Sequence, residues 1–85
     1  MNRYQQPVRT EAEHYLRTAE ACRANAIQER QIARDVGQLA ENEPDLQKRV
    51  DLYREMLDWD LHANALETHW APVYEAKAEA AEWAR

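Results

Sequence analysis

The sequence contains no serine and no phenylalanine, and it has one glycine, three prolines and one cysteine. A lone cysteine, Cys22, excludes a framework of internal disulfides in this 85-residue chain. A lone glycine, Gly37, excludes a glycine-rich loop that cradles phosphate. The sequence provides neither a nucleophile paired with a base nor a converging set of acid and base groups. We therefore predict that the protein is not an enzyme.

Long apolar runs and an excess of positive charge are also missing. The sequence holds no segment as long and apolar as a membrane span, and its N-terminus lacks the apolar core of a signal peptide, so we expect no membrane association and a cytoplasmic protein. The net charge is −5, and residues 41–85 alone carry −6. Duplex nucleic acid is therefore an unsuitable partner, whereas a basic protein surface is a suitable one.

The residues that are abundant favour helices. Fifteen alanines stand beside many Glu, Gln, Arg and Leu residues, which have the highest intrinsic helix propensities. Residues 1–85 therefore form a single all-α domain in this interpretation. Residues 1–9 show no periodicity and contain a proline, which is typical of a flexible arm.

A first helix is predicted over residues 11–41. Thr10 and Glu13 have the spacing of a capping box, in which the Thr10 hydroxyl accepts a hydrogen bond from the Glu13 amide. Within this helix, alanine recurs at every seventh position, which is typical of a seam along which a second helix packs closely, as in a coiled coil. The seam residues are Ala12, Ala19, Ala26, Ala33 and Ala40, and Glu29 interrupts the positions that alternate with them.

A second helix is predicted over residues 44–71, with Asn42 as a candidate N-cap and Pro44 in its first turn. It carries two apolar stripes about 120° apart, so it needs at least two neighbours. The first stripe consists of Leu46, Val50, Tyr53, Leu57 and Leu61. We assign the second stripe to a dimer or partner interface: Leu52, Met56, Trp59, Ala63, Leu66, Trp70 and Val73.

Pro72 leaves two architectures open. If it only kinks the second helix, residues 72–85 continue that helix, and the chain is a long antiparallel helical hairpin of roughly 45–60 Å. Such a hairpin leaves one stripe uncovered, and a homodimer forming a four-helix bundle would cover it. If Pro72 ends the helix, residues 72–85 form a third helix of a three-helix bundle. We favour the kinked helix and the dimer.

One constellation on the second helix has the chemistry of a metal site. Asp58 and His62 are four residues apart and share a helix face with Glu55, so the three side chains are candidate ligands for a divalent metal such as zinc. The competing interpretation is a face that points into water, which is the more common fate of exposed Asp and His on helices. No other cofactor is expected.

These observations favour a small acidic helical protein that acts without catalysis, by binding itself and another, unidentified protein. Proteins of this kind serve as adaptors, assembly factors or stoichiometric inhibitors, including ones encoded by phages and other mobile elements. Two alternatives remain: a metal-binding bundle based on Asp58 and His62, and an acidic mimic of nucleic acid that blocks a DNA-binding protein through Glu55, Asp58 and Asp60.

Overall fold

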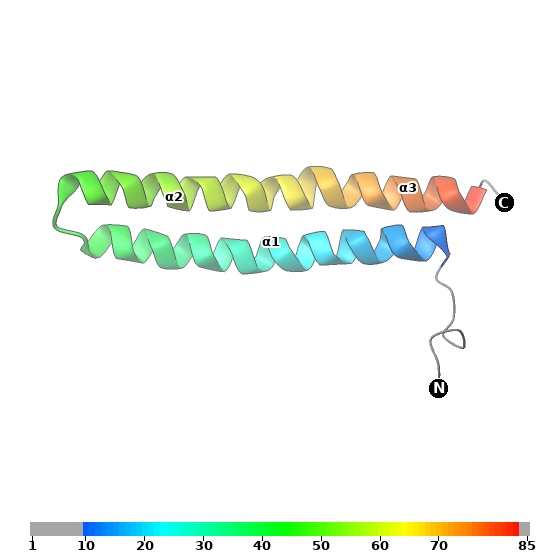
Figure 1. Cartoon of the computed structure of the whole chain (residues 1–85), viewed down its shortest axis with the longest axis horizontal. Coiled ribbons are helices and arrows are strands. Elements are labelled where there is room, and N and C mark those ends of the chain that lie inside the picture. Colours follow the sequence, from blue (N-terminus) through cyan, green and yellow to red (C-terminus); the bar gives the residue numbers. More distant parts are fainter. Residues whose placement is uncertain (1–9, 84–85) are drawn as a thin grey trace, which may run out of the picture.

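The computed structural model describes residues 10–83, and these form an antiparallel helical hairpin (Figure 1). One arm is α1, Glu11–Asn42. The other arm runs without a break through α2, Leu46–Ala65, a five-residue π-helical turn, Leu66–Trp70, and α3, Ala71–Trp83. The hairpin is 59 Å along its longest axis and 14 Å along its shortest. The predicted arm, residues 1–9, lies outside the described residues.

The start of α1 follows the predicted capping pattern. The Glu13 amide donates a hydrogen bond of 3.1 Å to the Thr10 hydroxyl, which satisfies one of the unpaired amides of the first turn. At the other end of the hairpin, the turn differs from the prediction. Asp45, rather than Asn42, is the N-cap of α2 and accepts from the Lys48 amide at 3.0 Å. Asn42 is the last residue of α1, where its side chain donates to the Gln38 carbonyl.

The two arms meet along the alanine seam of α1. All five seam alanines are buried, with exposed fractions between 0 and 5%. Cys22, Glu29 and Val36, which alternate with them, are buried as well. Methyl groups at every seventh position let the arms lie close together, but they give little volume to the core. Among residues 10–83, no large side chain is fully buried.

Gly37 contributes to the close approach near the turn. A Cβ atom added to Gly37 would lie 2.9 Å from the sulfur of Met56 on α2. The absence of a side chain therefore makes a notch in α1 that holds the Met56 thioether. This notch destabilises α1, because glycine inside a helix is about 1 kcal/mol less favourable than alanine.

The single long second arm is confirmed, and the folded-back third helix is not formed. Pro72 has no amide hydrogen, and in a regular helix its ring collides with the carbonyl four residues earlier. The π turn relieves this conflict, because the Ala71 amide donates to the Leu66 carbonyl, five residues back. The chain therefore passes Pro72 with one extra residue in a turn instead of breaking.

The π turn also changes which residues of α3 face α1. A regular continuation of the stripe from Leu66 would point Trp70, Val73 and Lys77 inward. With one extra residue the inward positions become Ala71 and Ala78, which are 0 and 2% exposed, and half-buried Tyr74. Trp70 is 44% exposed, so the structure corrects its predicted place on the stripe. The shift exchanges a large ring and a charged amine for methyl groups that fit against α1.

Candidate functional surface

The largest feature without a partner inside the hairpin is an apolar row on α2, here called the α2 stripe. Its residues recur at steps of 4, 3, 4 and 4, so they share one face of the helix. Each is more than a third exposed: Leu46 72%, Val50 37%, Tyr53 39%, Leu57 52% and Leu61 59%. Because exposed contiguous apolar surface marks interaction sites, the α2 stripe is the candidate functional surface.

The position of the stripe around α2 follows from the salt bridges between the arms. Glu67 comes directly after Leu66, which packs on the core, and it accepts from Arg30 at 2.5 Å. Tyr53 comes directly after half-buried Leu52 in the same way. Tyr53 and Leu57 therefore lie on the flank of the hairpin that carries the interhelical salt bridges. Val50 and Leu61, two residues before inward Leu52 and Ala63, lie farther round, on the side of α2 away from α1.

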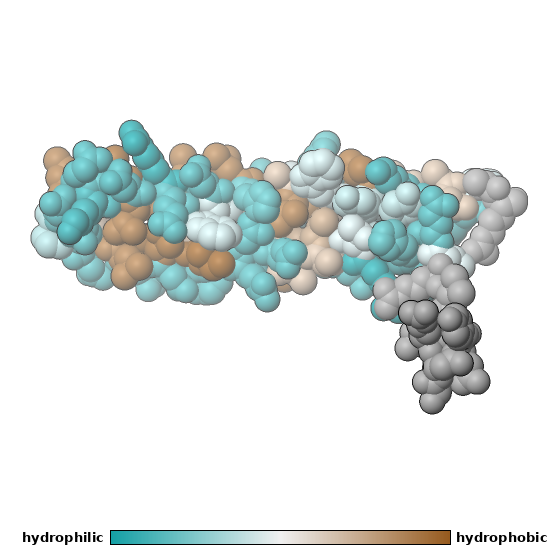
Figure 2. All heavy atoms as spheres, in the orientation of Figure 1, coloured by the Kyte–Doolittle hydropathy of each residue, from teal (hydrophilic) through white to brown (hydrophobic). Residues whose placement is uncertain are grey.

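The apolar surface is concentrated in one half of the molecule. In Figure 2 the most hydrophobic atoms gather over the half that holds the turn, whereas the half that holds the helix ends is largely hydrophilic or pale. On α1, the exposed residues Ile32 and Leu39 lie in the turn-proximal half as well. Each of them directly precedes a seam alanine, so they lie on the flank opposite the salt bridges.

The residues that we assigned to a dimer or partner interface lie between the arms for the most part. Ala63 is fully buried, and Trp70 is exposed. The remaining residues of this set are half-buried: Leu52, Met56, Trp59, Leu66 and Val73. Their stripe contains the small residue Ala63 and continues into Ala71 and Ala78, so it can approach the alanines of α1. The surface left open to a partner is therefore the other stripe.

The three candidate metal ligands do not gather. Glu55 and Asp58 are exposed, and the Nδ1 atom of His62 lies against a carboxylate oxygen of Glu29 on α1. Within the described part of the chain, no three His, Cys, Asp or Glu side chains are grouped so that they could hold a metal ion. Asp60, the third acid of the proposed nucleic-acid mimic, is also exposed.

The Glu29–His62 contact is the one polar contact between the buried seam and α2. The Glu29 side chain is 11% exposed, whereas the His62 side chain is 62% exposed. Since a carboxylate only accepts, the imidazole donates through Nδ1. The sequence signal for this pair was Glu29 itself, a charged residue in an apolar heptad position, but the sequence did not indicate which residue would lie across from it.

Two arginines in the middle of α1 bind carboxylates of the second arm, Arg30 that of Glu67 and Arg23 that of Glu75. Arg23 donates two hydrogen bonds to the carboxylate of Glu75, of 3.0 and 2.6 Å. These bonds to Arg23 lower the pKa of Glu75 below its usual value and raise that of Arg23. Arg23 and Arg30 each directly follow a buried residue of α1, Cys22 and Glu29, so they lie on one face beside the seam. Arg34, on the same face, instead donates to Gln31.

An aromatic cluster lies between the arms close to their ends. The rings of Tyr15 and Tyr74 stack with centroids 6.2 Å apart, and the Lys77 ammonium lies 5.8 and 5.3 Å from them. The nearby carboxylate of Glu11 raises the pKa of Tyr15, because it opposes formation of the phenolate. Trp83, 82% exposed, lies outside this cluster.

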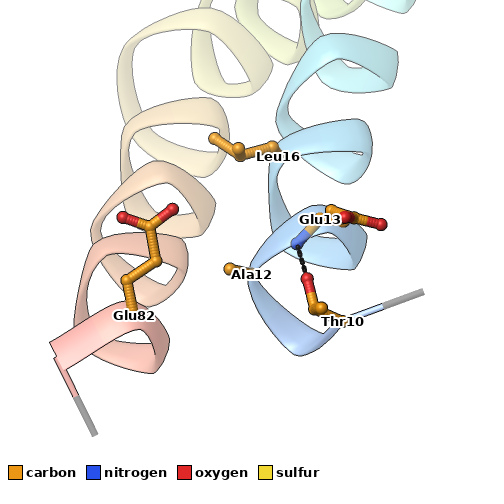
Figure 3. A pocket seen from close by; sticks show the side chains of 5 residues that line it. All are labelled: Thr10, Ala12, Glu13, Leu16 and Glu82. Carbon is orange, nitrogen blue, oxygen red and sulfur yellow. Dashed lines mark hydrogen bonds between the residues drawn. The ribbon is translucent and has the colours of Figure 1, made fainter. Parts of the chain in front are cut away.

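The helix ends enclose a shallow groove of about 300 Å³ (Figure 3). Its walls come from Thr10, Ala12, Glu13 and Leu16 on one arm and from Glu82 on the other. The Thr10 hydroxyl is engaged in the cap, and Figure 3 shows the Glu13 side chain directed away from Glu82, so the two carboxylates do not converge on the groove. This set provides no nucleophile and no paired acid and base.

Comparison of the chain with models of protein families, with curated proteins and with solved structures gives no match. None of the helices within residues 10–83 is long and apolar enough to cross a membrane.

Proposed function

We propose that the protein is a non-catalytic interaction module, which pairs with a second copy through the α2 stripe and, as a dimer, binds another protein as an adaptor, assembly factor or inhibitor. One observation carries the proposal. The α2 stripe exposes five large apolar side chains in the turn-proximal half of the hairpin, while the seam of α1 is filled mainly by alanine methyl groups. Much of the apolar side-chain volume of α2 thus lies outside the hairpin.

The energetics favour a partner of equal size. Covering the exposed parts of the five side chains contributes about 4–8 kcal/mol per copy, if complete burial of one such side chain contributes about 1.5–3 kcal/mol. Association costs about 4–15 kcal/mol in lost freedom of motion. A contact in which each copy covers the stripe of the other doubles the gain for one such cost. A second hairpin therefore satisfies the stripe better than a single small ligand does.

The net charge distribution supports a basic surface as the further partner. Residues 41–85 carry a net charge of −6, and their acids Glu55, Asp58 and Asp60 are exposed on α2. Clustered negative charge attracts a positively charged partner and speeds its association. Glu55 and Asp58 lie away from the α2 stripe, so the dimer can form and still present these two acids.

The test is the absolute mass of the purified protein by light scattering across a concentration series, with and without a chelator. We expect a dimer in both conditions, and we expect Leu57→Glu to shift it to a monomer by placing a charge on the stripe. Lys48→Glu is the matched control, because Lys48 is exposed on the opposite side of α2 and should leave the dimer intact. A monomer at all concentrations contradicts the proposal. A dimer lost only with chelator would favour a metal-dependent assembly instead.

A further inference from the structure

We infer that the two copies pair with their α2 helices antiparallel, with Leu46 opposite Leu57 of the other copy and Val50 opposite Tyr53. The inference rests on the proposed self-association and adds its orientation and register. Its first support is spacing. Leu46, Val50, Tyr53 and Leu57, the first four residues of the α2 stripe, are separated by 4, 3 and 4 residues, so these four positions read the same in both directions and can face a reversed copy of themselves. Leu61, the fifth residue of the stripe, lies beyond the paired layers in this register.

Side-chain volume distinguishes the two orientations. The antiparallel register places the small Val50 side chain opposite the large Tyr53 ring in both central layers. A parallel pair in register would instead place the two valines together and the two tyrosines together. Layers that combine a large and a small side chain fill the space between helices more evenly.

Charge gives the stronger distinction. The next position of the 4–3 pattern after Leu57 is Asp60, which is exposed. A parallel pair would bring the two Asp60 carboxylates together at the interface, where like charges repel and lose their hydration. In the antiparallel register, Asp60 lies beyond the apolar layers, at the level of the turn of the other copy. There it approaches the positive N-terminal end of α2, which begins at Leu46.

The helix dipoles favour the same orientation. Parallel helices align their dipoles side by side, whereas antiparallel helices place opposite ends together. The resulting assembly joins the two hairpins through their α2 helices, over the turn-proximal halves. The aromatic cluster of Tyr15 and Tyr74 and exposed Trp83 then lie in the other half of each copy, away from the dimer contact.

Disulfide trapping tests the register. In a Cys22→Ala background, Leu46→Cys and Leu57→Cys proteins are mixed, oxidised and separated on a non-reducing gel. We expect the mixture to form a covalent dimer at least about tenfold more than either variant alone, because a disulfide needs its Cβ atoms within about 4.5 Å. Two copies of Leu46→Cys would hold their thiols about 16 Å apart along the helix axis in this register.

A matched pair provides the control. Lys48→Cys mixed with Glu55→Cys has the same axial register but lies on the other side of α2, so it should not cross-link above the single variants. Efficient cross-linking of Leu46→Cys with itself would overturn the inference in favour of a parallel pair. Absence of every cross-link in variants that light scattering still shows as dimers would overturn the use of this face. If the unmodified protein is monomeric by light scattering, the proposed self-association itself fails.

Discussion

At Glu29 a carboxylate occupies a position of the seam where the neighbouring heptad positions hold alanine, cysteine and valine. Its only hydrogen bond to another side chain, within residues 10–83, is with His62. A buried carboxylate without a donor loses its hydration and gains little in return. The pair therefore contributes most by fixing which residues of the two arms lie opposite each other, as single polar groups do in coiled coils.

Replacement of His62 by alanine should destabilise the protein by about 1–3 kcal/mol, because it leaves the Glu29 carboxylate buried and unpaired. Urea unfolding followed by circular dichroism measures this difference. His69→Ala is the matched control, since His69 is exposed on the same arm and should change stability by less than about 0.5 kcal/mol. Equal effects of the two variants would contradict the role assigned to His62. Adding Glu29→Met to His62→Ala should restore most of the lost stability.

The Arg23–Glu75 pair predicts a dependence of stability on pH. Because the pKa of Glu75 is lowered in the folded chain, the pair stabilises the fold above the carboxyl pKa of the unfolded chain, and this contribution is lost as pH falls through the lowered value. We expect the thermal midpoint to fall less between pH 7 and pH 3 in Glu75→Gln than in the unmodified protein. Glu79→Gln, an exposed carboxylate on the same helix, should keep the full decrease. Identical pH profiles for all three proteins would argue against the pair as a source of stability.

At the scale of one element, the π turn at Leu66–Trp70 sets the rotation of all of α3. The sequence placed a distortion near Pro72, but it did not indicate the direction of the change. The apolar pattern after Leu66 fits two registers that differ by one residue, one through Trp70 and Val73 and one through Ala71 and Tyr74. Lys77, which interrupts the first register, was the only signal in favour of the second.

The choice between registers depends on the facing helix. Alanines along α1 leave room only for small side chains opposite them, and Ala71 and Ala78 meet that requirement. The same reason explains why the stripe with Ala63 faces α1 and the stripe with Leu57 does not. Apolar periodicity alone could not separate two stripes of similar hydrophobicity, so the sequence predicted an uncovered stripe but named the other one.

Deletion of Thr68 together with Pro72→Ala should be tolerated, because it removes both the extra residue of the π turn and the proline that requires it. The shortened arm becomes a regular helix that still points Ala71 and Ala78 toward α1. We expect a helical circular dichroism spectrum and a thermal midpoint within about 5 °C of the unmodified protein. Deletion of Asp58 together with Pro72→Ala is the control, and it should lower the midpoint much further, since α2 is regular there. A large loss from the Thr68 deletion would show that the π turn has another role.

At the scale of the whole molecule, a hairpin of two arms has little interior. We could predict the helical hairpin, its length and its long second arm from the sequence. They follow from helix propensity, apolar periodicity and the scarcity of glycine and proline, which interrupt helices. The exact caps were less so, because Asn42 and Asp45 have similar capping ability and the turn selects between them. The partner chemistry was not predictable beyond a preference for a second copy and for basic surfaces.

If the α2 stripe completes the fold in a dimer, stability must depend on protein concentration. We expect the thermal midpoint to rise by several degrees between about 1 and 100 µM, because association draws the equilibrium toward the folded dimer. Calorimetry across that range measures the shift, and Leu57→Glu should show a lower midpoint that does not change with concentration. A midpoint of the unmodified protein that is independent of concentration would indicate a hairpin that is stable alone.

The turn at Glu43–Asp45 has a consequence for the order of folding events. Arg49 donates two hydrogen bonds to the Glu43 carbonyl, of 3.0 and 2.9 Å, and the Asp45 side chain caps α2, so the turn is stabilised by residues a few positions apart. Contacts farther along the arms join residues that are progressively more distant in the chain, and closing longer loops costs more entropy. Contacts between the two arms should therefore form first at the turn and then progressively toward the helix ends. The rate of folding is then governed by the turn, and the rate of unfolding by contacts that form later, in the half of the hairpin away from the turn, such as the one between Arg23 and Glu75.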